Sequence, residues 1–159
     1  MKTYARPLLV LLAAAALIAS VLSLYVHYQL YNDPSYTSFC DVTETVSCEA
    51  VLQSRYATMF GVPVAAGGTI WAALVLLLAW RGMAGDAGSK ARDEGAAVAG
   101  YIFLLATVGL SAVLYLGYAS FFVLQKACPL CMTMYVSVIG IFIVSGAAAS
   151  VSQIGRAHV

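Results

Sequence analysis

Four long apolar stretches dominate the pattern of hydrophobic and polar positions along the chain. They cover residues 7–30, 62–80, 96–124 and 129–149, and polar segments separate them. A helix needs about 20 mostly apolar residues to cross the hydrocarbon core of a bilayer. The pattern therefore predicts an all-α membrane protein with four transmembrane helices packed as a bundle.

Composition points the same way, because hydrophobic residues make up 62% of the chain and charged residues only 9%. So few charges cannot cover the surface of a water-soluble protein of this size. We expect one integral membrane domain, residues 1–159, with two connections of note. One is the loop at 31–61, called the cysteine loop below because it holds two of the four cysteines, and the other is a short polar loop at 81–95.

The distribution of charges predicts the orientation, because loops rich in lysine and arginine stay in the cytoplasm. Basic residues gather before the first span, between the second and third, and after the fourth: Lys2, Arg6, Arg81, Lys90, Arg92 and Arg156. The cysteine loop instead carries four acidic residues and one basic residue: Asp33, Asp41, Glu44, Glu49 and Arg55. We expect a multi-pass protein of the inner (cytoplasmic) membrane with both termini in the cytoplasm and the cysteine loop outside.

A cleaved signal peptide is an alternative interpretation of the N-terminus, since two basic residues precede an alanine-rich apolar run. That run is longer than the apolar region of a signal peptide and lacks a clear small-residue cleavage site. The first stretch is therefore interpreted as a span, and its alanines, together with the small residues at 65–68, favour close helix contacts in the membrane.

A short helix is predicted inside the cysteine loop, from Cys48 to about residue 58. Ser47 is a suitable N-cap and Glu49 places an acid in the first turn. Helical spacing puts the thiol on one stripe with two apolar residues and a cation, namely Cys48, Val51, Leu52 and Arg55. We expect this helix to lie on the membrane surface, and Pro63 to fall in the first turn of the second span.

All four cysteines fall in regions predicted to face outside, where disulfides persist. Cys128 and Cys131 form a CxxC motif at the start of the fourth span, with Pro129 suited to the first turn. Residues three apart share a helix face, so the two sulfurs can bridge. The positive end of the helix dipole and the nearby Lys126 would stabilise a thiolate, which is the nucleophile of disulfide exchange.

Tyr135 continues the stripe of Cys128 and Cys131 one turn deeper. A tyrosine near the end of a span is commonly an interfacial anchor. Directly beneath a CxxC motif, the hydroxyl is also a candidate hydrogen-bond donor to a reacting group.

Cys40 and Cys48 form the second pair, and alone they would suggest a static disulfide in an extracytoplasmic loop. Beside a CxxC motif they are better interpreted as a mobile carrier that exchanges with the inner pair. A tetrahedral metal site of four cysteines is a further alternative, although Cys40 and Cys48 lack the short spacing of zinc ligands. His27 and His158 add nothing to it, so we expect no metal.

The sequence resembles the vitamin K epoxide reductase family over essentially its whole length. Residues 39–57 and 60–63 are similar to the family's outer loop, and residues 128–135 are similar to its CxxC helix. The resemblance implies that Cys128 and Cys131 are the active-site pair, with Cys131 nearest a membrane quinone of the ubiquinone or menaquinone type. It also implies that Cys40 and Cys48 are the shuttle pair, and that Ser54 and Tyr135 line the quinone site.

The resemblance further implies an oxidoreductase that transfers electrons from dithiols to a quinone and so supports disulfide formation. Many bacterial members carry a fused thioredoxin-like domain after the fourth span, which is not expected here, so the partner would be a separate periplasmic thioredoxin-like protein. The quinone-contacting asparagine of the vertebrate enzymes has no counterpart before the second span. The alternatives are a quinone or quinone-epoxide reductase whose main product is the reduced quinone, and a non-enzymatic metal-binding membrane protein.

Overall fold

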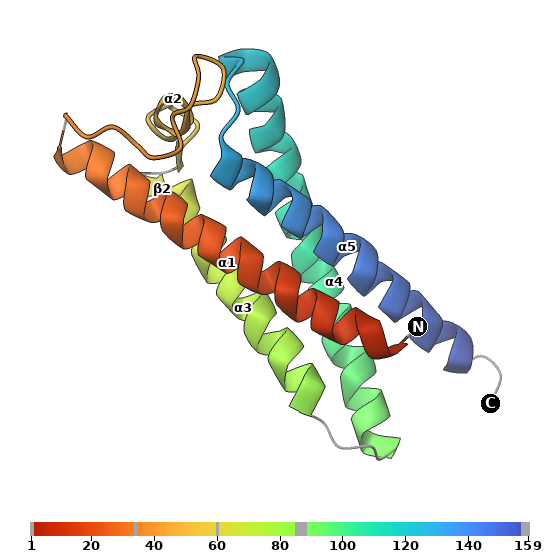
Figure 1. Ribbon diagram of the computed structural model, residues 1–159. Coiled ribbons are helices and arrows are strands. Elements are labelled where there is room, and N and C mark those ends of the chain that lie inside the picture. Colours follow the sequence, from red (N-terminus) through yellow and green to blue (C-terminus); the bar gives the residue numbers. More distant parts are fainter. Residues whose placement is uncertain (1, 34, 60, 85–88, 157–159) are drawn as a thin grey trace.

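The protein forms a bundle of four long helices in a computed structural model that describes residues 2–33, 35–59, 61–84 and 89–156 (Figure 1). Its elements are α1 (Lys2–Asn32), α2 (Cys48–Leu52), β1 (Thr58–Met59), β2 (Val62–Pro63), α3 (Val64–Ala84), α4 (Ser89–Tyr118), the π-helical turn η1 (Ala119–Leu124) and α5 (Pro129–Arg156). Four segments are long and apolar enough to cross a membrane: Ala5–Asn32, Val64–Arg81, Ala97–Leu124 and Pro129–Ala148. The predicted four-span architecture is confirmed.

Each long helix packs against two neighbours, in the circular order α1, α3, α4 and α5. The centre of the bundle is a cluster of buried side chains from all four: Leu9, Ala13, Val75, Ala79, Ile102, Ala106 and Ile141. Ala13 and Ala16 are fully buried, which confirms the predicted close contact of the alanine run. Large apolar side chains such as Leu11 and Val108 point outward instead, as expected of a surface solvated by lipid tails.

Packing between α3 and α4 depends on a glycine. The Trp71 indole Nε1 donates a hydrogen bond to the Leu105 carbonyl across this contact, at 2.8 Å. A Cβ atom built on Gly109 would lie 2.8 Å from the Trp71 ring. Only glycine therefore lets the indole lie against the backbone of α4 and satisfy its donor.

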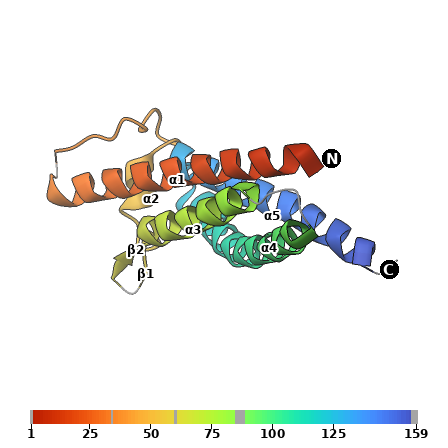
Figure 2. The same cartoon turned by 90° about the horizontal axis from the view of Figure 1, so that it is seen from below.

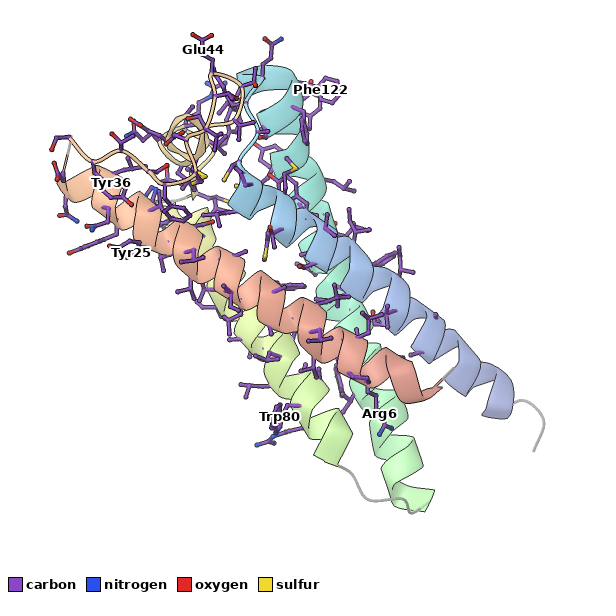
Figure 3. The ribbon with its side chains drawn as sticks, in the orientation of Figure 1. Arg6, Tyr25, Tyr36, Glu44, Trp80 and Phe122 are labelled. Carbon is purple, nitrogen blue, oxygen red and sulfur yellow. A yellow bond between two sulfur atoms is a disulfide. The ribbon has the colours of Figure 1, made fainter. Side chains whose placement is uncertain are left out.

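The two ends of the bundle differ in what they carry. The first residues of α1 and the last of α5 share one end, whereas the cysteine loop and η1 share the other (Figure 1). Figure 3 shows Arg6 and Trp80 at the first end and Glu44 and Phe122 at the second. Tyr25, Tyr28 and Tyr31, at the cysteine-loop end of α1, are more than half exposed. This is the placement expected for aromatic side chains at membrane–water boundaries.

The predicted helix at 48–58 is too long, because α2 ends at Leu52 with Gln53 as its C-cap. The Ser54 hydroxyl donates to the Val51 carbonyl at 2.7 Å, a local bond that competes with continuation of the helix. Arg55 consequently does not share a stripe with Cys48 and stacks on the Tyr56 ring.

A small hairpin leads from this point into the second span. Thr58 and Met59 pair with Val62 and Pro63, and the turn contains Gly61 with φ of 80°. The hairpin projects to one side of the bundle (Figure 2). The sequence had suggested that Pro63 lies in the first turn of the second span. It instead pairs in the hairpin and precedes α3.

The polar loop expected at 81–95 is also largely helical. α3 continues to Ala84 and α4 already begins at Ser89. Within this segment, residues 85–88 lie outside the described part of the chain. No proline interrupts this segment, so the flanking helices extend into it although it contains four glycines, at 82, 85, 88 and 95. Its polar residues had indicated a loop, but they lie largely on extensions of α3 and α4.

Candidate active site

The short helix α2 is held at both ends in front of the start of α5. At its N-terminus the Ser47 hydroxyl accepts a hydrogen bond from the Ala50 amide at 3.1 Å, which confirms the predicted N-cap. At its C-terminus the Leu52 carbonyl accepts a bond from His27 Nδ1 at 2.9 Å. His27, to which the sequence assigned no role, thus anchors α2 to α1.

A backbone bridge ties the cysteine loop to the segment before the CxxC motif. Val46 and Ala127 form a parallel β-bridge. Ser47 donates its amide to the Ala127 carbonyl at 3.0 Å, and the Ala127 amide donates to the Thr45 carbonyl at 2.8 Å. The bridge lies two residues before Cys48 and one residue before Cys128, so it brings the two cysteine-bearing segments together.

The chain reaches this bridge by a sharp reversal at the end of η1. Gln125 adopts a left-handed conformation with φ of 53°, and the Ser120 hydroxyl donates to the Lys126 carbonyl at 2.6 Å. The Lys126 ammonium group, expected to stabilise a CxxC thiolate, bonds to the Glu44 carbonyl instead. Lys126 therefore stabilises the contact between the cysteine loop and the segment before α5.

The sulfur atoms of three cysteines meet in a buried cluster below the loop. Cys40 and Cys48 are joined by a disulfide. Cys128 is a free thiol, and its Sγ lies 3.3 Å from Cys48 Sγ. Cys48 and Cys128 are both fully buried, among apolar side chains that include Val26 and Leu52. A thiolate at Cys128 is thus in contact with a disulfide sulfur that it can attack.

Cys128 directly precedes α5, and groups of the first turn face its sulfur. The Cys131 amide donates to Cys128 Sγ at 3.4 Å. A hydrogen bond from the Cys131 side chain lowers the pKa of the Cys128 thiol; burial opposes the shift, and the amides of Cys131 and Leu130 add to it. The negative charge of Asp41 acts in the opposite direction. The net result favours the nucleophilic thiolate at Cys128.

Two polar residues surround Cys40 that the sequence analysis did not identify as part of the site. The Ser38 hydroxyl is buried, lies 3.5 Å from Cys40 Sγ, and also donates to the Asp41 carboxylate. The other Asp41 oxygen accepts from the Glu49 amide at 3.4 Å. Although burial raises the pKa of Asp41, bonds from the Ser38 and Ser47 hydroxyls and two amides outweigh it and lower the pKa. The serine two residues before Cys40 and the aspartate directly after it were the available signal.

Tyr135 and Ser54 lie in different surroundings. Tyr135 is half-buried on α5 and faces α4, where a Cβ atom built on Gly117 would lie 3.7 Å from its ring. Within the described part of the chain, no hydrogen bond occupies the Tyr135 hydroxyl. Ser54, by contrast, donates its single proton to the Val51 carbonyl. Tyr135 therefore has a donor to offer, whereas Ser54 would first have to release Val51.

A metal centre has no support in the part of the chain that the structure describes, where no group of three or more His, Cys, Asp and Glu side chains is arranged to hold an ion. Two of the cysteines are joined to each other. His27 is engaged with Leu52, and His158 lies outside the described residues.

Comparison with known families agrees with this architecture. The model of the vitamin K epoxide reductase family matches residues 7–146 of the 159-residue chain. The match includes all four cysteines, the bridge between the two cysteine-bearing segments and all but the outermost residues of the four candidate spans. The chain belongs to the vitamin K epoxide reductase family, and it is a multi-pass membrane thiol oxidoreductase.

Proposed function

We propose that this protein oxidises a thioredoxin-like partner through Cys40 and Cys48 and passes the electrons through Cys128 and Cys131 to a membrane quinone. The observation that carries the proposal is the 3.3 Å contact between Cys48 Sγ and Cys128 Sγ. A static disulfide has no need of a reactive thiol in contact with it. An exchanging disulfide does.

The first step is attack by a partner thiolate on Cys40. A partner–Cys40 disulfide forms, the Cys40–Cys48 bond breaks, and Cys48 leaves as a thiolate. A second partner thiolate then displaces Cys40, so the partner gains a disulfide and the cysteine loop holds two thiols. Cys48 faces Cys128 and is buried, which supports Cys40 as the cysteine that meets the partner.

The second step passes the electrons inward. The Cys48 thiolate attacks Cys128 of a Cys128–Cys131 disulfide, so the 48–128 bond forms and Cys131 leaves as a thiolate. Cys40 then attacks Cys48, which closes the 40–48 bond, breaks the 48–128 bond and leaves a thiolate on Cys128. The resulting state has a loop disulfide and two inner thiols, as in this structure.

The third step removes the electrons from the inner pair. A quinone of the ubiquinone or menaquinone type would supply the chemistry, by accepting two electrons and two protons from the dithiol. Cys131, which is partly exposed, is the thiol proposed to face the acceptor. The Tyr135 hydroxyl would donate a hydrogen bond to an acceptor oxygen, and Ser54 remains a weaker candidate for the same role.

The orientation follows from charge. We propose that both termini lie in the cytoplasm and that the cysteine loop faces the periplasm across the inner membrane, because the basic residues concentrate at the opposite end. The partner would then be a separate periplasmic protein.

A purified-protein assay tests the proposal. With a dithiol donor and a soluble quinone, absorbance should report steady quinone reduction, and Cys131→Ala should abolish it. Thr133→Ala, on an exposed face of the same helix, should retain the rate. Quinone turnover that survives Cys131→Ala would refute this electron path, and metal binding without turnover would favour the non-enzymatic alternative.

A further inference from the structure

The buried Ser38 hydroxyl has one proton and two neighbours that could accept it, Cys40 Sγ and the Asp41 carboxylate. A carboxylate is a far stronger acceptor than a sulfur atom, so the proton points to Asp41. The lone pairs of Ser38 then face Cys40. In this arrangement Ser38 can accept a bond from a Cys40 S–H group but cannot donate one to a Cys40 thiolate.

The environment of Cys40 therefore disfavours negative charge on its sulfur. The Asp41 carboxylate is hydrogen-bonded to Ser38, whose hydroxyl lies 3.5 Å from Cys40 Sγ. A nearby negative charge disfavours a second negative charge on that sulfur. The Asp41 charge acts on Cys128 as well, but the Cys128 sulfur also receives the Cys131 amide at the start of a helix, a donor of the kind that Ser38 does not offer to Cys40. Of the two thiols that compete for Cys48, Cys128 is the better site for a thiolate.

We propose that Ser38 and Asp41 bias the exchange at Cys48, so that the electron pair moves from Cys40 to Cys128 and is held back from returning. Ser38 contacts the reacting sulfur, and Asp41 acts through Ser38 as a positioning residue. This inference rests on the proposed function, because it gives a direction to the transfer between the two pairs.

The biased step balances without any outside reagent. The Cys40 thiolate attacks Cys48 of the Cys48–Cys128 disulfide, so the 40–48 bond forms, the 48–128 bond breaks and the electron pair moves onto Cys128. A thiolate at Cys40 is replaced by one at Cys128, and the proton lost by Cys40 goes to water. In reverse, Cys40 would have to leave as a thiolate, and the Ser38 lone pairs and the Asp41 charge beside it disfavour that leaving group.

Other titratable groups pack in the same cluster, namely Tyr36, Cys128 and Cys131, and Glu49 approaches through its amide. Among the described residues, Asp41 is the carboxylate that hydrogen bonds connect to Cys40. Its substitution is therefore the direct way to change the charge beside this sulfur.

The test uses the full chain with Cys131→Ser, which removes the resolving thiol and keeps a hydroxyl that can donate to Cys128. Three cysteines remain, so the protein contains one disulfide and one thiol, and these equilibrate internally. After acid quenching and alkylation, mass spectrometry of peptides reports the ratio of the 48–128 disulfide to the 40–48 disulfide. Neither a partner nor a quinone is needed.

Asp41→Asn is nearly isosteric, and its carbonyl can still accept from the Glu49 amide. Its NH₂ group donates to Ser38, so the Ser38 hydroxyl turns and donates to a Cys40 thiolate. The loss of the Asp41 charge favours a thiolate at Cys128 as well, so the gain at Cys40 comes from the Ser38 hydroxyl that turns toward it. Because each pKa unit changes such a ratio tenfold, we expect the ratio of the 48–128 disulfide to the 40–48 disulfide to rise by about tenfold. Ser38→Ala should produce a smaller rise, since the charge remains.

Glu44→Gln is the matched control, because it removes a charge from the same loop at an exposed position outside this hydrogen-bond network. It should leave the ratio unchanged. If Asp41 merely held the loop in place, Asp41→Asn would separate Cys48 from Cys128 and the 48–128 share would fall. A fall, or no change, overturns the proposal, and neither result bears on whether quinone is reduced.

Discussion

His27 Nδ1 donates to the Leu52 carbonyl at 2.9 Å and so joins the last quarter of α1 to the last residue of α2. A carbonyl only accepts, so the ring must carry a proton on Nδ1. α2 has a single turn and few bonds of its own, and Cys48 is its first residue. The position of the Cys48 sulfur therefore depends on a side chain of a membrane-spanning helix.

Replacing His27 should loosen α2 without unfolding the bundle. His27→Ala removes a bond worth about 1 kcal/mol. Hydrogen exchange of the Gln53 amide, which bonds the Glu49 carbonyl, should become about fivefold faster. His27→Gln, which keeps a donor, should recover part of the protection. Gln29→Ala, on the same helix and bonded to Tyr25, should change nothing at Gln53.

The contact of Cys48 with Cys128 predicts a selective cross-link. In a Cys40→Ala/Cys131→Ala variant, mild oxidation should give one intramolecular disulfide rapidly, because the sulfurs are already 3.3 Å apart. Mass spectrometry under non-reducing conditions identifies it. The Cys40→Ala/Cys128→Ala variant, which keeps Cys48 and Cys131, is the comparison and should react more slowly. Equal rates in both variants would contradict the assigned pairing.

Cys128 should titrate at lower pH in the folded protein than in denaturant. Its folded pKa is lowered, so folding favours the thiolate form. This contribution to stability is present above the pKa of an unfolded thiol, about 8.5, and is lost as the pH falls through the lower folded value. Ultraviolet thiolate absorbance with the loop disulfide intact measures the midpoint. Cys131→Ala should move the midpoint upward, since the Cys131 side chain is the main cause of the shift.

Gly109→Ala should destabilise the contact between α3 and α4. The added methyl group would collide with the Trp71 ring and displace its bond to Leu105. Overpacking of this kind costs about 1–3 kcal/mol. Thermal unfolding in detergent should show the loss. Gly100→Ala, on the same helix with open space around the new atom, should leave the unfolding temperature near that of the parent protein.

The proposed orientation predicts which sites a membrane-impermeant maleimide reaches. In a cysteine-free variant, Tyr31→Cys should react from the periplasmic side, and Arg81→Cys only after the membrane is permeabilised. Both positions are exposed in the protein, so burial does not protect either one. The reverse pattern of labelling would place the cysteine loop in the cytoplasm.

Much of the fold could be predicted because membrane spans and caps are local signals. Four apolar runs located the candidate spans to within about two residues, although α4 and α5 extend further, and Ser47 marked the start of α2. The end of α2 could not be read in the same way. The helical spacing of Cys48, Val51 and Leu52 continues to Arg55. The bond from the Ser54 hydroxyl to the Val51 carbonyl nevertheless ends the helix before that residue.

The sequence identified the cysteines of the candidate site but not the groups that surround them. A CxxC motif at the start of a span is visible in the sequence, whereas the approach of Cys48 to Cys128 joins residues 80 positions apart. That contact depends on the bridge between Val46 and Ala127, whose residue types carry no pairing signal. The partners of His27 and Ser38 depend equally on tertiary placement.

The bridge between Val46 and Ala127 also bears on how the protein can be altered. Its hydrogen bonds are made by main-chain groups, so the spacing of the sulfurs does not depend on the exposed side chains of Glu44 and Thr45. Thr43 is different, because its hydroxyl accepts a bond from the Val46 amide. Glu44 and Thr45 can therefore be changed to suit a different partner protein while the contact between Cys48 and Cys128 is retained. For redox engineering, these exposed side chains can be exchanged without altering the backbone that holds the two cysteine-bearing segments together.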